Sequence, residues 1–115
     1  MCCVLYAVCC VLCVLYVRTG IAACDGLWDE MSSDTAVYLV GHFFKLNPKA
    51  SGNEAAEFLL AQALKLVVKR LQAEEPQMAI DTVEQLMALP PGKDGRRALH
   101  DDISIAVIRY VLMRL

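Results

Sequence analysis

Apolar side chains recur every three or four positions through the middle of the chain, in residues 34–46 and again in residues 54–73. This spacing predicts two amphipathic helices, each of which packs one face against a core. Asn47-Pro48 is expected to end the first helix. Asn53 is placed to cap the second, because its side-chain oxygen can accept from a free N–H of the first turn. Both helices are therefore expected to be core-packing elements with a solvated charged face.

The remaining segments follow other patterns. Pro76 can begin a third helix that runs to residue 89 and stops before the Pro90-Pro91-Gly92 run. Residues 103–110 alternate, which predicts a strand entered directly from Asp101-Asp102. An earlier apolar run ends at Asp25-Gly26, where we expect a strand to stop and the chain to turn. One face of the second strand is expected to carry Ile103, Ile105 and Val107, and the other Ser104, Ala106 and Ile108.

Taken in order, the pattern predicts a strand, a turn, three helices and a strand, which is an α+β arrangement. Trp28 offers a large apolar anchor for the turn, and Ser32 or Ser33 can cap the helix that follows it. Two strands and three helices do not close a two-layer core. We therefore expect the fold to be incomplete on its own.

Residues 1–17 contain no charged side chain, and five of the six cysteines fall within the first thirteen positions. As a membrane helix this segment is slightly short, since a span needs about 20 residues. As a signal peptide it lacks a basic start. Cys10 and Cys13 could form a metal or redox site, although no histidine lies near them in sequence. The β-branched and aromatic content also suits a buried strand.

Composition narrows the classes of function. With 115 residues the chain is one domain or less, and a formal net charge of −2 gives no electrostatic reason to expect nucleic-acid binding. Asp25 is either a turn residue that bonds its own backbone or an acid held at a strand end. His42, among apolar positions, is expected to pack rather than to bind a ligand. The basic loop of residues 93–97 is either solvated or able to attract an acidic substrate.

Two stretches carry a family resemblance. The run ACDGLWDEMS resembles the Asp-Gly-Leu-Trp-Asp motif of the metal-dependent protein serine/threonine phosphatases, the PPM or type-2C family. Near the C-terminus, HDDISIAVIRY is similar to the closing strand of that family. The resemblance covers about residues 20–110 and implies that residues 18–115 form the C-terminal part of the phosphatase domain, an α-β-β-α sandwich. In that family an apolar strand leads into the Asp-Gly pair, and here Arg18-Thr19-Gly20 would interrupt that strand. The resemblance therefore leaves residues 1–17 as a separate segment: a strand, a membrane segment, or sequence from a mispredicted start or intron.

The resemblance also implies a chemistry. Asp25 and Asp101 match metal-binding aspartates that hold one Mg²⁺ or Mn²⁺ ion, of two in a complete domain, and Asp102 is expected to be structural. The reaction would be hydrolysis of phosphoserine or phosphothreonine by a metal-activated water. The Asp-Asp-Ile order is similar to the pyruvate dehydrogenase phosphatase branch, which implies the mitochondrial matrix or the cytoplasm.

The upstream metal-site and phosphate-binding elements of the family are missing from this sequence. We therefore expect the chain to be inactive alone, with a phosphoprotein as substrate of the complete enzyme and no nucleic-acid partner. The alternative is a non-catalytic, phosphatase-like interaction protein, anchored to a membrane if residues 1–17 are a span.

Overall fold

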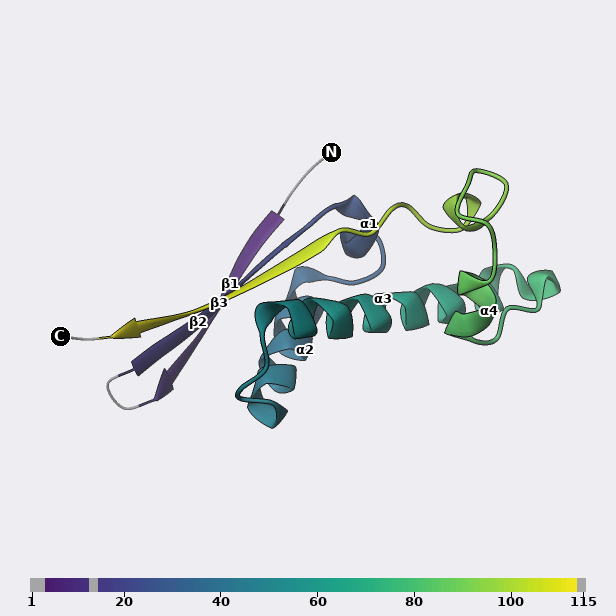
Figure 1. Ribbon diagram of the computed structural model, residues 1–115. Coiled ribbons are helices and arrows are strands. Elements are labelled where there is room, and N and C mark those ends of the chain that lie inside the picture. Colours follow the sequence, from purple (N-terminus) through teal and green to yellow (C-terminus); the bar gives the residue numbers. More distant parts are fainter. Residues whose placement is uncertain (1–3, 13–14, 114–115) are drawn as a thin grey trace.

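A three-stranded antiparallel sheet and a set of helices on one of its faces make up the computed structural model (Figure 1), which describes residues 4–12 and 15–113, with side chains from residue 19 to residue 109. Strand β2 (Leu15–Ala23) lies between β1 (Val4–Leu12) and β3 (Ile105–Met113). The sheet thus joins the two ends of the chain. Cys13 and the side chain of Cys10 lie outside the described residues, as does any site that they would form.

The central strand β2 does not break where the sequence predicts it to break. Residues 18–20 continue the ladder on both sides: Thr19 is opposite Val8 of β1 and Arg109 of β3. Thr19 itself is buried, with 6% of its surface exposed. The expected interruption is wrong because cross-strand pairing on both edges holds an Arg-Thr-Gly segment in extended form despite its weak strand propensity. The strand also runs across position 17, where the composition changes.

The first helices begin close to where the pattern places them. The chain leaves β2 into a single helical turn, α1 (Asp25–Trp28), and then enters α2 (Ser33–Leu46), which Ser32 caps by accepting from the Thr35 N–H at 3.2 Å. Helix α3 (Gly52–Glu74) is capped by Ser51, which accepts from the Glu54 N–H at 3.1 Å. The expectation of an Asn53 cap is therefore wrong: two good capping residues stand two positions apart, and the upstream one begins the helix.

The third helix is also corrected. Pro76–Met78 form one 3₁₀ turn, and Ala79 then takes a left-handed conformation with φ of 53°. A separate short helix, α4 (Val83–Met87), begins at a capping box in which Thr82 and Gln85 bond each other's backbone. That box supplies a second helix start, so the segment divides into two turns instead of one helix. A further 3₁₀ turn, Arg96–Ala98, precedes β3.

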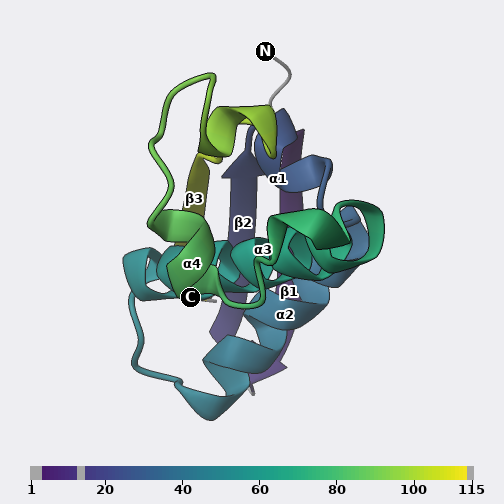
Figure 2. The ribbon, with the colours of Figure 1, turned by 90° about the vertical axis from the view of Figure 1, so that its right-hand side faces the viewer.

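The helices cover one face of the sheet, as the stacked ribbons in Figure 2 show. A first core cluster joins the sheet to α2 and the first half of α3, with Ile21, Leu27, Val40 and Leu59 fully buried. A second cluster joins the other half of α3 to α4 through Val67, Leu71 and Leu86.

The closing strand is expected to begin at residue 103, directly after Asp101-Asp102, but β3 begins at Ile105, because its partner strand β2 ends at Ala23, which is opposite Ile105. The predicted alternation of its side chains is confirmed. Val107 is buried and Ile105 is half-buried on the helix side, whereas Ala106 and Ile108 are exposed on the opposite face. The opposite face is the one that a second sheet of a sandwich would cover, so the α-β-β-α architecture stays a prediction. Within the described part of the chain, no helix has both the length and the hydropathy that a membrane span needs.

Candidate functional site

The two motifs lie in direct contact where β2 ends and β3 begins, although about 78 residues separate them in sequence. Ala23 at the end of β2 pairs with Ile105 at the start of β3. The segment that follows β2 and the segment that precedes β3 therefore lie next to each other. A Cβ atom added at Gly26 would stand 2.0 Å from the Asp102 carbonyl oxygen and 3.2 Å from the Ile103 Cα. Because only a residue without a side chain permits this approach, Gly26 is required by packing and not by an unusual φ.

Cys24 joins the same two segments through its backbone and its side chain. Its N–H donates to the Ser104 carbonyl at 3.2 Å. The thiol Sγ donates to the Asp102 carbonyl at 3.1 Å and accepts from the Ser104 N–H at the same distance. The side chain is buried, so these bonds are shielded from water. The thiol thereby extends the ladder between β2 and β3 by one further step.

Trp28 acts as the anchor that the sequence predicts. Its indole N–H donates to the Ala23 carbonyl at 3.0 Å, and its half-buried ring packs against the first core cluster. This bond ties the end of α1 back to the end of β2. The turn that carries Asp25 is thus held at both ends.

The candidate metal ligands stand on these contacting segments. Asp25 begins α1, directly before Gly26, and Asp101 lies directly before Asp102; all three carboxylates are exposed. One Asp101 carboxylate oxygen accepts from the Asp102 N–H at 2.8 Å. Neither Asp25 nor Asp101 forms an ion pair with a described side chain. At least one oxygen of each of these two carboxylates therefore has no hydrogen-bond or ion-pair partner among the described residues.

The donor chemistry suits a hard divalent cation but does not complete its shell. Mg²⁺ takes about six oxygen ligands in near-octahedral order, often with several waters. Asp25 and Asp101 would supply two of them. Among the side chains that the structure describes, no group of three or more His, Cys, Asp or Glu residues could hold a metal ion. The described residues therefore do not form a complete metal site by themselves.

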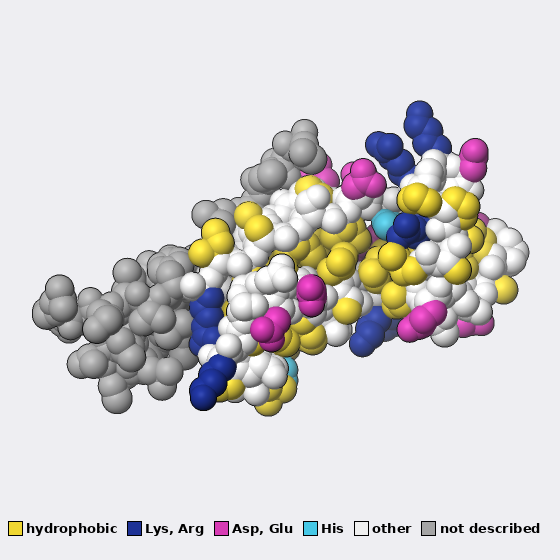
Figure 3. Space-filling view, in the orientation of Figure 1, with side chains coloured by type: hydrophobic (Ala, Val, Ile, Leu, Met, Phe, Trp, Pro, Cys, Tyr) yellow, Lys and Arg dark blue, Asp and Glu magenta, His cyan; other side chains and the backbone are white. Residues whose placement is uncertain are grey.

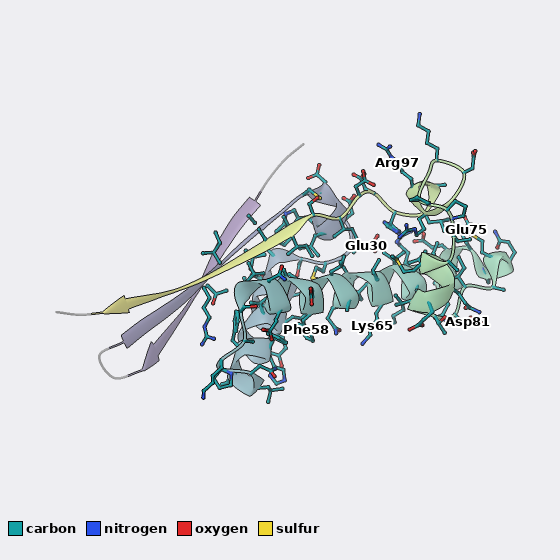
Figure 4. The ribbon with its side chains drawn as sticks, viewed as in Figure 1. Glu30, Phe58, Lys65, Glu75, Asp81 and Arg97 are labelled. Carbon is teal, nitrogen blue, oxygen red and sulfur yellow. The ribbon has the colours of Figure 1, made fainter. Side chains whose placement is uncertain are left out.

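An ion pair between Arg70 and Glu30, which the sequence does not predict, connects α3 to the two motifs. Arg70 of α3 donates to both Glu30 carboxylate oxygens, at 2.8 and 3.4 Å, and to the Leu99 carbonyl at 2.8 Å. The Glu30 side chain is only 5% exposed, and Figure 4 shows it between α1 and α3. Its hydrogen bond raises the pKa of Arg70 above the ordinary value, against the opposing effect of burial. The pair joins the end of the first motif to the segment before the second.

The other polar residues of interest lie elsewhere. His42 is exposed on α2 and stacks on Tyr38, with ring centroids 6.0 Å apart. It is not packed in the core, because it lies on the outer side of the helix. In the basic loop Arg97 is exposed and Arg96 is half-buried. Figure 4 places Arg97 above α3, near the segment that leads into β3.

Known proteins resemble the chain in sequence. It is 39% identical over 88 residues to "Probable protein phosphatase 2C 40" of Arabidopsis thaliana, a match that covers 76% of this chain and 15% of that protein. It is 38% identical over 84 residues to "Probable protein phosphatase 2C 39" of Oryza sativa subsp. japonica, covering 73% of this chain and 14% of that protein. No protein-family model and no solved structure matches.

Each match covers about three quarters of this chain. The chain spans only 14–15% of the length of these curated relatives. Neither name refers to a pyruvate dehydrogenase phosphatase, so that branch stays a prediction. From these sequence matches, the chain belongs to the protein phosphatase 2C family.

Proposed function

We propose that the chain forms the C-terminal part of a metal-dependent protein serine/threonine phosphatase domain. The observation that carries the proposal is the contact between Gly26 and the backbone of Asp102 and Ile103, since it brings two distant aspartate-bearing motifs to one edge of the sheet. The names of the two relatives support the reaction class.

Asp25 and Asp101 would together hold one Mg²⁺ or Mn²⁺ ion. Such an ion, when bound, supplies an acidified water and neutralises phosphate charge. The protein's own part is positional: Cys24 and Trp28 fix the turn that carries Asp25, and the Asp102 N–H orients the Asp101 carboxylate. We expect Asp102 not to share the ion, because neighbouring side chains of an extended segment would point to opposite faces.

Two carboxylates alone would bind such an ion weakly, so we propose that the chain does not turn over a phosphopeptide by itself. The complete protein would act on phosphoserine or phosphothreonine in protein substrates. The small donor set also favours a second candidate, a phosphatase-like interaction protein without catalysis. The two candidates differ in whether Asp25 and Asp101 bind a metal ion.

A titration with Mn²⁺ separates these candidates. Paramagnetic Mn²⁺ should broaden the amide signals around residues 24–26 and 101–103 in a saturable way. Asp25→Asn and Asp101→Asn should each weaken this effect about tenfold, as expected for the loss of one charged ligand. Asp102→Asn is the matched control and should leave the effect within about twofold.

Three results would count against the proposal. Broadening that does not saturate would remove the metal site and favour the interaction protein. If Asp102→Asn weakens Mn²⁺ binding more than Asp101→Asn does, the metal ligand is Asp102 and not Asp101. Turnover of a phosphoserine peptide by the chain with Mn²⁺ would contradict the expected inactivity.

A further inference from the structure

The segment that carries Asp25 and the segment that carries Asp101 are joined at two places. The first is the end of the sheet, where the backbone and the thiol of Cys24 bond the residues that lead into β3. The second is the side chain of Arg70, which reaches both segments from α3. Figure 3 shows acidic side chains, in magenta, on the surface at the upper edge of the molecule, where these two segments run. Each candidate metal ligand thus lies between the two connections on its own segment.

A single guanidinium group makes the second connection. Arg70 Nη2 donates to one Glu30 carboxylate oxygen and to the Leu99 carbonyl, each at 2.8 Å, and Nε donates to the other Glu30 oxygen at 3.4 Å. The guanidinium is planar and rigid, so these bonds fix the Leu99 backbone relative to the Glu30 carboxylate. The Glu30 side chain is nearly buried, and this burial strengthens the bonds by excluding water.

Short stretches of backbone connect this bridge to the candidate ligands. On the first segment the Asp29 N–H donates to the Asp25 carbonyl at 2.8 Å, and the next N–H, that of Glu30, bonds within the same turn at 3.0 Å. On the second segment Asp101 lies two positions after Leu99. A displacement at either end of the bridge is therefore passed on to the carboxylate beside it.

We propose that Arg70 is a positioning residue for the metal site and holds the Asp25 and Asp101 segments at one separation. This inference rests on the proposed function, because it concerns the cation that the two aspartates would share. The bonds of Cys24 alone would let the segments pivot about the end of the sheet, and the bridge removes that freedom. Mg²⁺ and Mn²⁺ take oxygen ligands in octahedral order, so two ligand segments that separate would lose the shared ion.

The sign of the effect separates positioning from electrostatics. Arg70 is positively charged and repels a cation, so removal of its charge alone would strengthen Mn²⁺ binding, whereas removal of the bridge would weaken it. In the Mn²⁺ titration, Arg70→Gln should weaken binding about tenfold, as expected for the loss of a group that orients metal ligands. Lys69→Gln is the matched control, because it removes the same charge from an exposed side chain at the neighbouring position of α3. It should leave Mn²⁺ binding within about twofold.

Loss of the bridge also destabilises the fold, so stability needs its own control. Ser51→Ala removes the cap at the other end of α3, leaves the bridge intact and should keep Mn²⁺ binding within about twofold. Hydrogen exchange in EDTA gives a readout without metal: Arg70→Gln should accelerate exchange of the Cys24 and Ser104 amides about fivefold more than Ser51→Ala does, the factor for one lost hydrogen bond. If Arg70→Gln does not fold, as judged by circular dichroism, Arg70→Lys takes its place. It keeps the charge opposite Glu30 without the guanidinium fork, and its expected loss of Mn²⁺ affinity is about threefold.

Three outcomes would overturn this role and leave the proposed metal site standing. Equal Mn²⁺ binding by the Arg70→Gln and Lys69→Gln chains would show that the bridge does not position the ligands. Tighter binding by Arg70→Gln would show that the guanidinium acts only as a repelling charge. Equal losses in Arg70→Gln and Ser51→Ala would reduce the role of Arg70 to general stability. If instead the unmodified chain shows no saturable Mn²⁺ binding, the proposed function itself fails, and this role of Arg70 fails with it.

Discussion

Replacing Gly26 with alanine tests whether the contact between the two motifs organises this protein. The new methyl group would lie 2.0 Å from the Asp102 carbonyl oxygen and 2.7 Å from its carbonyl carbon, whereas ordinary contact begins at 3.4 Å. Both obstacles are backbone atoms, so no side-chain rotation can relieve the overlap. The segment before β3 must retreat by more than an ångström.

That retreat sets the size of the effect. Overpacking costs about 1–3 kcal/mol. Moving the segment also stretches the Cys24 bonds to Asp102 and Ser104, one of which is worth about 1 kcal/mol. Alanine recovers about 0.5–1 kcal/mol as a better helix former in α1. The net loss in free energy of unfolding should therefore be about 1–3 kcal/mol, or roughly 4–12 °C in the melting temperature.

Urea and thermal unfolding of the whole chain, followed by circular dichroism, measure this loss. Gly92→Ala is the matched control, because a Cβ at that position would meet no atom within 4 Å. The control should stay within about 0.5 kcal/mol of the unmodified chain. If Gly26→Ala unfolds at the same urea concentration as the control, the two motifs do not pack as described.

Two further substitutions test contacts that the sequence does not predict. Glu30→Gln should lower the free energy of unfolding by about 1–2 kcal/mol, because it removes the charge from a nearly buried partner of Arg70. Glu74→Gln is the control, since the Glu74 side chain is 62% exposed and lies 3.7 Å from the same arginine. In urea unfolding it should cost less than about 0.5 kcal/mol. Because the pKa of Arg70 is raised, the stability from its charge is fully present below its ordinary pKa and is lost only as the pH rises through the raised value, so a pH series should show no loss from this group at neutral pH. Ser51→Ala should lower the free energy of unfolding by about 1 kcal/mol, because it removes the N-cap of α3. Asn53→Ala should be neutral or stabilising. If thermal unfolding shows a larger cost for Asn53→Ala than for Ser51→Ala, Asn53 is the cap.

Local patterns predict the long elements well. The apolar period of α2 and α3 depends on residues within a few turns of one another, and so does the alternation of β3. The helix boundaries were harder to predict. At the start of α3, for example, Ser51 and Asn53 are both good capping residues, and the sequence alone does not show which of them caps the helix. The capping box at Thr82 and Gln85 was visible in the sequence and could have revealed the start of α4.

The candidate site follows a similar division. The family resemblance, not the hydrophobic pattern, singled out Asp25 and Asp101, and their role as metal ligands remains a prediction. The roles of Cys24 and Glu30 could not be read from neighbouring residues. Each depends on a partner more than thirty positions away: Asp102 for the thiol and Arg70 for the carboxylate.

By itself, the sequence determined the two long helices, the closing strand, the turn at Asp25-Gly26 and the family, because each is written in short-range spacing or in contiguous motifs. Only the tertiary structure decided that β2 continues through residues 18–20, that Gly26 contacts the Asp102 backbone, and that Glu30 pairs with Arg70. These features depend on which distant backbone groups meet when the strands pair, and strand pairing is set by the whole sheet and its core.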